Sequence, residues 1–141
     1  IRSSTINSKI NLLKHAEDIR ILGDENKIAQ VFDNLIQNAA SFSKGNNFIN
    51  IRIEKNLENV IITVEDNGPG FSKGSLKKVF DRFYTDRPKN EKFGNHSGLG
   101  LSISKQIVEA HNGSIEALNR LNQKNECLGG SVKVTFPEVK N

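Results

Sequence analysis

Hydrophobic residues recur along this chain with two different periods, which predict helices and strands in turn. Over residues 28–42 they return at steps of three and four, the period of one buried helical face, and Asp24 stands before them as a helix N-cap. A second segment of this kind covers residues 98–111, and Gly113 follows it as a stop signal. We therefore expect two amphipathic helices.

Alternation of apolar and polar residues predicts the strands. The alternating segments are 49–53, 60–65, 114–118 and 131–136. The first two are separated by a turn at 56–59 and are expected to form a hairpin. Two short apolar pieces near the start, 9–13 and 19–22, are also expected to pair as strands. Strands in one layer and helices in the other indicate an α+β fold, a two-layer sandwich in which a mixed sheet packs on helices.

Size and composition indicate one globular domain, residues 1–141. Hydrophobic residues make up 35% and charged residues 26% of the chain, and no apolar stretch approaches the roughly 18 residues that span a bilayer. The formal net charge is +4, but Lys and Arg are scattered, which argues against a nucleic-acid partner. The single cysteine, Cys127, cannot form an internal disulfide, in agreement with a reducing cytoplasm.

The strand predicted at 60–65 ends at a carboxylate beside a flexible turn, Asp66-Asn67-Gly68-Pro69-Gly70. Glycine allows another group to approach the main chain, and proline fixes the turn. A carboxylate at such a rim can accept a hydrogen bond from the amino group of an adenine-type ring. Any hairpin could carry this turn, so the motif indicates a function only in combination with the other motifs of the chain.

Asn34 and Asn38 lie four residues apart on the first predicted helix and share a face at the edge of its apolar stripe. They could be polar residues at the solvent border. Alternatively, they could present amide oxygens to a hard cation such as Mg²⁺. The second helix opens with Gly98-Leu99-Gly100-Leu101, where free backbone N–H groups could face an anion.

These motifs, in their order along the chain, resemble the N, G1, F and G2 boxes of the catalytic ATP-binding domain of bacterial sensor histidine kinases. The third box is Phe80-Asp81-Arg82-Phe83-Tyr84, and the resemblance spans residues 23–137. It implies the Bergerat (GHKL) ATP-binding fold with a flexible ATP lid over about residues 71–97. It also implies ATP and Mg²⁺ as cofactors.

The resemblance assigns roles to individual residues. Asn38 would bind Mg²⁺ and Asn34 would assist catalysis beside it. Asp66 would accept from the adenine amino group over a floor of Gly68 and Gly70. An aromatic ring against adenine and a hydroxyl near the adenine-bound water would come from Phe42 and Ser131, respectively.

The lid would contribute the remaining contacts. The box from Gly98 to Leu101 would face the phosphates, and Tyr84 would help to dock the lid. Ser41 and Thr85 stand where the family often has basic residues, so Arg82 or Arg87 would supply that charge instead.

The resemblance implies that this domain transfers the ATP γ-phosphate to a histidine on its own dimerisation and phosphotransfer helices, with a response regulator downstream. His15, His96 and His111 lack the context of a phosphoacceptor, so we expect that substrate helix to lie outside this chain. We further expect a monomeric, cytoplasmic domain that is not itself inserted in a membrane, belonging to an inner-membrane sensor.

Two further functions stay open on the residues alone. A nucleotide-binding dock without phosphotransfer would explain Ser41 and Thr85. Another ATPase of the same fold would need a hydrolytic base where Asn34 stands, and an amide cannot take a proton from water.

Overall fold

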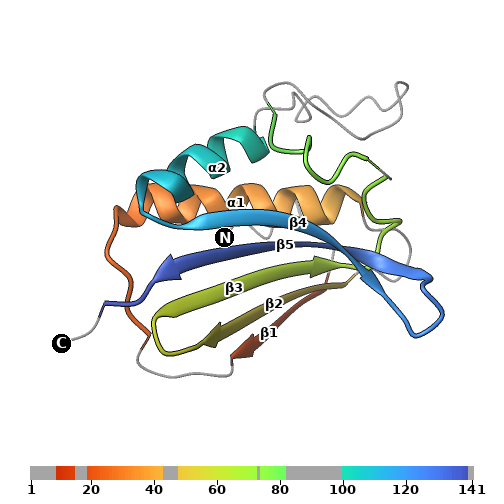
Figure 1. Cartoon of the computed structure of the whole chain (residues 1–141), viewed down its shortest axis with the longest axis horizontal. Coiled ribbons are helices and arrows are strands. Elements are labelled where there is room, and N and C mark those ends of the chain that lie inside the picture. Colours follow the sequence, from red (N-terminus) through yellow and green to blue (C-terminus); the bar gives the residue numbers. More distant parts are fainter. Residues whose placement is uncertain (1–8, 15–18, 43–47, 73, 82–99, 140–141) are drawn as a thin grey trace.

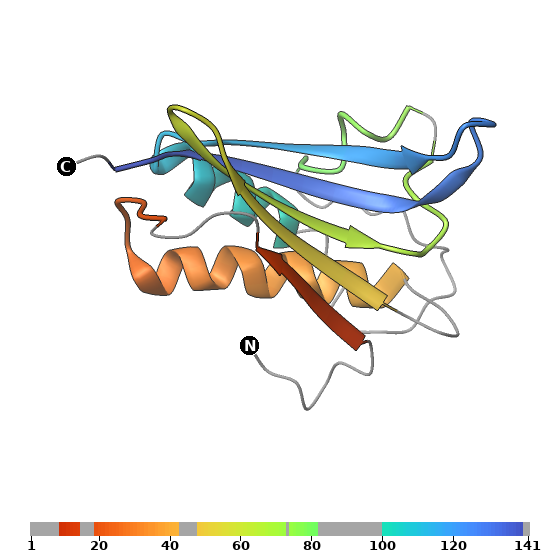
Figure 2. The same cartoon turned by 90° about the horizontal axis from the view of Figure 1, so that it is seen from below.

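The computed structural model describes residues 9–14, 19–42, 48–72, 74–81 and 100–139, which form five strands and two helices. The strands are β1 (Lys9–Lys14), β2 (Phe48–Lys55), β3 (Asn59–Asp66), β4 (Ser114–Leu121) and β5 (Cys127–Pro137). The helices are α1 (Glu25–Phe42) and α2 (Gly100–Ala110). Both helices cover the same face of the sheet, so the fold has two layers (Figures 1 and 2). The predicted α+β sandwich is confirmed.

The sheet is mixed and has the strand order β1-β2-β3-β5-β4. β1 pairs with β2 in parallel, and every other neighbouring pair is antiparallel. The β2–β3 hairpin turns at Asn56, whose side-chain oxygen accepts the backbone N–H groups of Glu58 and Asn59. Strand β5 lies between β3 and β4, so the closing hairpin completes the sheet beside the end of β3.

Helix α1 forms where the apolar period predicted it. The Asp24 side chain accepts the N–H groups of Asn26 at 2.9 Å and Lys27 at 3.1 Å, which confirms Asp24 as the N-cap. The apolar stripe of α1 is buried against the sheet and helix α2. Its buried members are Val31, Leu35, Ile36 and Ala39.

Helix α2 ends in a Schellman motif, in which Asn112 takes the left-handed conformation with φ of 63°. The N–H of Gly113 donates to the Val108 carbonyl, and the N–H of Asn112 donates to the Glu109 carbonyl. Gly113 follows the helix end, as predicted for a stop signal. The position requires glycine for space, since a Cβ there would collide with the Thr135 carbonyl oxygen.

The prediction of a strand at residues 19–22 was wrong. Within the described residues, the segment accepts a backbone hydrogen bond from the N–H of Val139 to the Arg20 carbonyl at 2.8 Å and joins no strand ladder. Ile21 packs on the core while Leu22 is exposed, so these residues lead into α1. Neither helix in the described segments combines the length and the apolar character needed to cross a membrane.

Candidate functional site

The Asp66 carboxylate lies at the end of β3 and is almost completely buried, with 5% of its surface exposed. Its Oδ1 accepts two backbone N–H groups, from Gly68 at 2.8 Å and from Gly130 at 3.1 Å. Among the described residues no hydrogen bond reaches Oδ2. One oxygen therefore anchors the side chain, and the other can accept a donor from a ligand.

Burial raises the pKa of Asp66 above the 3.8 of a free carboxyl group. The hydrogen bonds from Gly130 and Gly68 and the charge of Arg120 act in the opposite direction and lower the pKa, but burial is the larger effect. A buried carboxylate gains more from a hydrogen-bond donor than an exposed one does, because little water competes for it. A ligand that donates a hydrogen bond to this carboxylate is therefore bound more strongly than one that does not.

Two glycines of β5 bring its backbone unusually close to the end of β3. A Cβ at Gly129, where φ is +150°, would collide with the Asp66 carbonyl oxygen. A Cβ at Gly130 would lie 3.1 Å from the Phe71 ring and 3.4 Å from Asp66 Oδ2. Gly129 therefore permits the close approach of the two backbones, and Gly130 leaves room beside the carboxylate that a side chain would fill.

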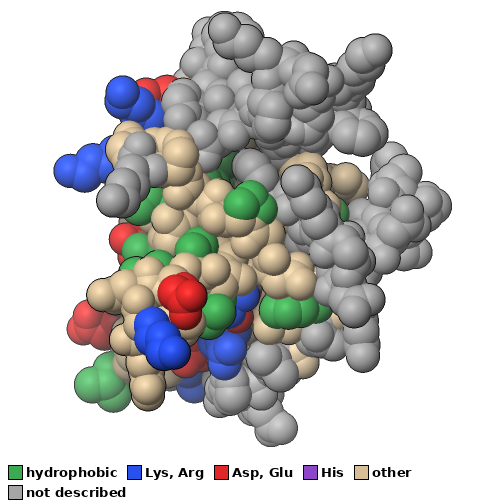
Figure 3. Space-filling view, turned by 90° about the vertical axis from the view of Figure 1, so that its right-hand side faces the viewer, with side chains coloured by type: hydrophobic (Ala, Val, Ile, Leu, Met, Phe, Trp, Pro, Cys, Tyr) green, Lys and Arg blue, Asp and Glu red, His purple; other side chains and the backbone are tan. Residues whose placement is uncertain are grey.

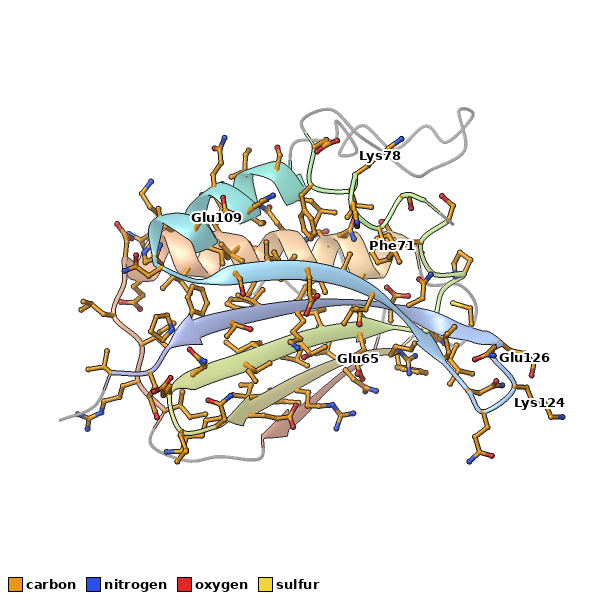
Figure 4. The ribbon with its side chains drawn as sticks, in the orientation of Figure 1. Glu65, Phe71, Lys78, Glu109, Lys124 and Glu126 are labelled. Atoms are coloured by element: carbon orange, nitrogen blue, oxygen red, sulfur yellow. The ribbon has the colours of Figure 1, made fainter. Side chains whose placement is uncertain are left out.

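Gly70 needs both its conformation and its small size. Its φ is +83°, and a Cβ there would lie 2.5 Å from the sulfur of Cys127 and 2.7 Å from Oδ1 of Asn119. The predicted Asp66–Gly70 turn thus packs directly on the β4–β5 hairpin. Phe71, the next residue, lies nearer to helix α1, whereas Lys124 and Glu126 lie at the far tip of that hairpin (Figure 4).

Strand alternation does not support the predicted role of Ser131. Ser131 pairs with Glu65 in the ladder, while the side chain of Asp66 follows on the other face of the sheet. The residue beside the carboxylate is Gly130, which contacts it through its backbone N–H. The β5 contact with the carboxylate in the described residues is therefore a main-chain donor, and the role of the Ser131 hydroxyl stays a prediction.

The structure brings Asn34 to the start of α2. The Asn34 amide nitrogen lies 3.3 Å from the Gly100 carbonyl oxygen and 3.4 Å from Oγ of Ser104. The Ser104 hydroxyl also donates to the Gly100 carbonyl at 2.9 Å. The N-terminus of α2, with Gly100 and Leu101, is thereby fixed against the face of α1 that carries Asn34.

Asn38 lies one helical turn after Asn34 and is half-buried, and its backbone carbonyl accepts the Ser41 hydroxyl at 2.7 Å. Amide oxygens suit Mg²⁺, which is commonly held by a few protein oxygens together with substrate phosphates and water. Within the described residues, no group of three or more His, Cys, Asp or Glu could hold a metal. The Asn38 amide oxygen is of the donor type that Mg²⁺ takes.

Part of the predicted site falls outside the described residues. These positions are the side chain of Phe42 and all of Arg82, Tyr84, Arg87, Gly98 and Leu99. The predicted lid began at residue 71, but its first part belongs to the core. Phe71, Val79 and Phe80 are buried in the same cluster as the helix stripe.

Asn119 and Arg120 are the site residues that the sequence did not predict. Asn119 exchanges two hydrogen bonds with the backbone of Phe71, and Arg120 donates to the Asp66 carbonyl at 2.7 Å. The sequence predicted a strand that ends at residue 118, before these two polar residues. Strand β4 continues to Leu121 and carries both of them into the site.

Charges of both signs occur among the described residues at this end of the molecule. In Figure 3, Lys and Arg side chains alternate with Asp and Glu over the coloured part of the face, with apolar side chains between them. On the coloured part of that face, neither sign of charge forms a patch of its own. This agrees with the scattered distribution of Lys and Arg in the sequence.

Comparison with known proteins places the chain in a family. Residues 23–140 match the family model described as "Histidine kinase-, DNA gyrase B-, and HSP90-like ATPase". The sensor protein ChvG of Agrobacterium fabrum is 44% identical over 119 residues, which cover 84% of this chain and 20% of that protein. The chain thus spans about a fifth of the length of this curated relative.

Solved structures agree with the sequence comparison. The catalytic domain of histidine kinase ThkA is 31% identical, with a TM-score of 0.76 over 94% of this chain and 80% of that one. ThkA has also been solved in complex with the response regulator protein TrrA. A mycobacterial sensor histidine kinase, MprB, shares the fold with a TM-score of 0.81 at 22% identity, covering 94% of this chain and 85% of that one.

Proposed function

The chain belongs to the histidine kinase-, DNA gyrase B- and HSP90-like ATPases, as the ATP-binding catalytic domain of a sensor histidine kinase, and from this premise we propose how it acts. It binds Mg²⁺-ATP, with Asp66 holding the adenine amino group, and transfers the γ-phosphate to a histidine on a separate helical domain. The observation that carries the proposal is the buried Asp66 carboxylate, anchored through Oδ1 and available through Oδ2.

Base recognition follows from the surroundings of Asp66. A donor on a planar ring can reach Oδ2 because Gly130 carries no side chain beside it. The Gly68 N–H fixes the carboxylate from within the turn, and Gly70 allows the turn to fold onto β4 and β5. A hydrogen bond formed at this buried carboxylate favours the amino group of adenine over a base that lacks it.

Metal and phosphate contacts are proposed on the other side of the site, along α1. Asn38 would ligate Mg²⁺ through its amide oxygen, and Asn34 would orient water or the phosphates beside it. The metal would neutralise charge on the phosphates. The N-terminus of α2 would face the same phosphates, together with Gly98, Leu99 and one of the lid arginines, Arg82 or Arg87. Tyr84 and Phe42 would complete the enclosure.

The phosphoacceptor is proposed to lie outside this chain. His111 uses both ring nitrogens in the fold: Nε2 accepts the Asp24 N–H at 3.0 Å, and Nδ1 lies 2.7 Å from the Ile107 carbonyl oxygen. A histidine that joins two helix ends in this way is not presented for phosphorylation. His15 and His96 lie outside the described residues.

The partners are proposed by analogy with the relatives. The domain would act on the dimerisation helices of its own protein, which would then pass the phosphate to a response regulator, as the complex of ThkA with TrrA suggests. Its place would be the cytoplasmic side of an inner-membrane sensor, since the curated relatives are sensor proteins.

Phosphoryl transfer tests this function. The chain is mixed with the purified helical hairpin of its own kinase and γ-labelled ATP, with and without Mg²⁺. We expect label on the hairpin histidine only when Mg²⁺ is present. ATP binding without label transfer would support a regulatory nucleotide dock, and rapid ATP hydrolysis without the hairpin would support a hydrolytic ATPase.

A further inference from the structure

Two consecutive residues of β4 hold the segment from Asp66 to Phe71 at its two ends. Asn119 holds the Phe71 end: its Oδ1 accepts the Phe71 N–H at 2.7 Å, and its Nδ2 donates to the Phe71 carbonyl at 2.9 Å. Such a two-bond pair between a side chain and one backbone residue copies the exchange seen between paired strands. It fixes both the position and the orientation of Phe71.

Arg120 holds the Asp66 end from the other face of the sheet. Its Nη2 donates to the Asp66 carbonyl at 2.7 Å and lies 3.3 Å from the Leu128 carbonyl oxygen, so one guanidinium joins the ends of β3 and β5. Its Cζ lies 5.9 Å from the centre of the Phe48 ring. Gly129 lies opposite Arg120 in the ladder and places no side chain in its path.

The register of β4 changes immediately after Arg120, between Arg120 and Leu121. Irregularities of this kind redirect side chains and are frequent beside functional sites. Within the described residues, Arg120 Nε is also the one buried side-chain polar atom without a hydrogen-bond partner. An unpartnered buried donor destabilises a fold, so this arginine is an unexpected choice if its role were stability alone.

We propose that Asn119 and Arg120 are positioning residues for base recognition: they fix both ends of the Asp66–Phe71 segment, and so set where the Asp66 carboxylate meets the base. The inference rests on the proposed function, because it assumes that Asp66 contacts adenine. Neither residue needs to touch the nucleotide. Both bond to the main chain on either side of the turn, and Arg120 also acts on the Asp66 carboxylate through its charge. A small displacement of the carboxylate weakens a hydrogen bond steeply.

A purely structural role would have a different signature. If the two residues only stabilised the hairpin, their loss would weaken the binding of every nucleotide by the same factor. If they position Asp66, their removal weakens only the hydrogen bond between Asp66 and the 6-amino group. The ratio of the affinities for ADP and for purine riboside diphosphate, which lacks that amino group, separates the two roles.

The experiment measures both dissociation constants by calorimetry for wild type, Asn119→Ala and Arg120→Met. Asn122→Ala is the matched control for the asparagine, since its hydrogen bonds to Lys124 and Glu126 stay within the hairpin loop. Arg52→Met is the control for the arginine, since Arg52 pairs with Glu65 on the sheet at 3.5 Å. Arg120→Lys carries the test if Arg120→Met does not fold.

We expect each of the two positioning variants to weaken ADP binding about tenfold while purine riboside diphosphate changes less than about twofold. Both controls should keep the wild-type ratio. Equal loss for the two nucleotides, or no loss for either, would overturn the positioning role while leaving the proposed function intact. A wild-type chain that binds both nucleotides equally would instead contradict Asp66 as the adenine contact, and the inference would fall with it.

Discussion

The substitution Asp66→Asn is expected to weaken nucleotide recognition without a loss of folding stability. It keeps the shape of the side chain and an oxygen that can accept the Gly68 and Gly130 N–H groups. It replaces the second oxygen by an amino group, which would meet the amino group of adenine donor to donor. We expect nucleotide binding to weaken by about 2–4 kcal/mol, or ~30- to 1000-fold in the dissociation constant.

The effect of Asp66→Asn on stability should have the opposite sign. Because burial raises the pKa of Asp66 above 3.8, the folded state holds its proton to higher pH than the unfolded state does. The stability contributed by the neutral acid is complete below about pH 3.8 and is lost as pH rises through the raised pKa. At pH 7 the ionised carboxylate therefore destabilises the fold, and the uncharged amide should unfold at an equal or higher temperature.

The assay combines calorimetry with ATP and thermal unfolding at pH 7, on wild type and Asp66→Asn. Glu65→Gln is the control, since Glu65 precedes Asp66 but pairs with Arg52 on the other face of the sheet, and it should bind ATP normally. A variant that binds ATP as tightly as wild type would refute the role of the carboxylate. A variant that loses binding together with a large loss of stability would refute the sign of the burial effect.

Three further predictions concern the scaffold of the site. Gly129→Ala should lower the free energy of unfolding, measured in urea, by about 3 kcal/mol or more, because at φ of +150° its Cβ would collide with a backbone carbonyl. Gly74→Ala is the control: its φ is +83° and its surroundings are open, so it should lower the free energy of unfolding by only about 1 kcal/mol. Similar losses for both variants would contradict the collision at Gly129. Asn34→Ala should lower the same free energy by about 1 kcal/mol without nucleotide, because it removes the link to α2; no change in urea unfolding would show that link to be unimportant. Asn112→Gly should raise the free energy of unfolding by up to about 1 kcal/mol, because glycine adopts the left-handed conformation without strain. A lower free energy of unfolding would show that the asparagine side chain contributes more to stability than this strain costs.

Local patterns predicted the elements whose contacts are close in sequence. Helix α1 has a regular apolar stripe and a capping Asp24, and the β2–β3 hairpin has its turn at Asn56. The pairing of β1 with β2 and of β5 with β3 joins distant segments, and neither pairing leaves a local signal in the sequence. Residues 19–22 are as apolar as a strand, yet no neighbour in the described sheet pairs with them.

The site was likewise predicted only where its residues are close together in the sequence. Asp66 and its glycine turn form a continuous motif, whereas Asn119 and Arg120 reach the turn only after the β4–β5 hairpin has folded beside it. Strand alternation in the sequence also bears on Ser131. Val132 and Val134 alternate into the core, which already places the odd-numbered Ser131 on the opposite face.

A crystal structure of this chain with Mg²⁺ and a non-hydrolysable ATP analogue would test most directly whether the buried carboxylate recognises the base. We predict that the exocyclic amino group of adenine lies within hydrogen-bond distance of Oδ2 of Asp66, with Mg²⁺ between the phosphates and the amide oxygen of Asn38. An adenine ring bound away from the end of β3, with no donor facing Asp66, would contradict it.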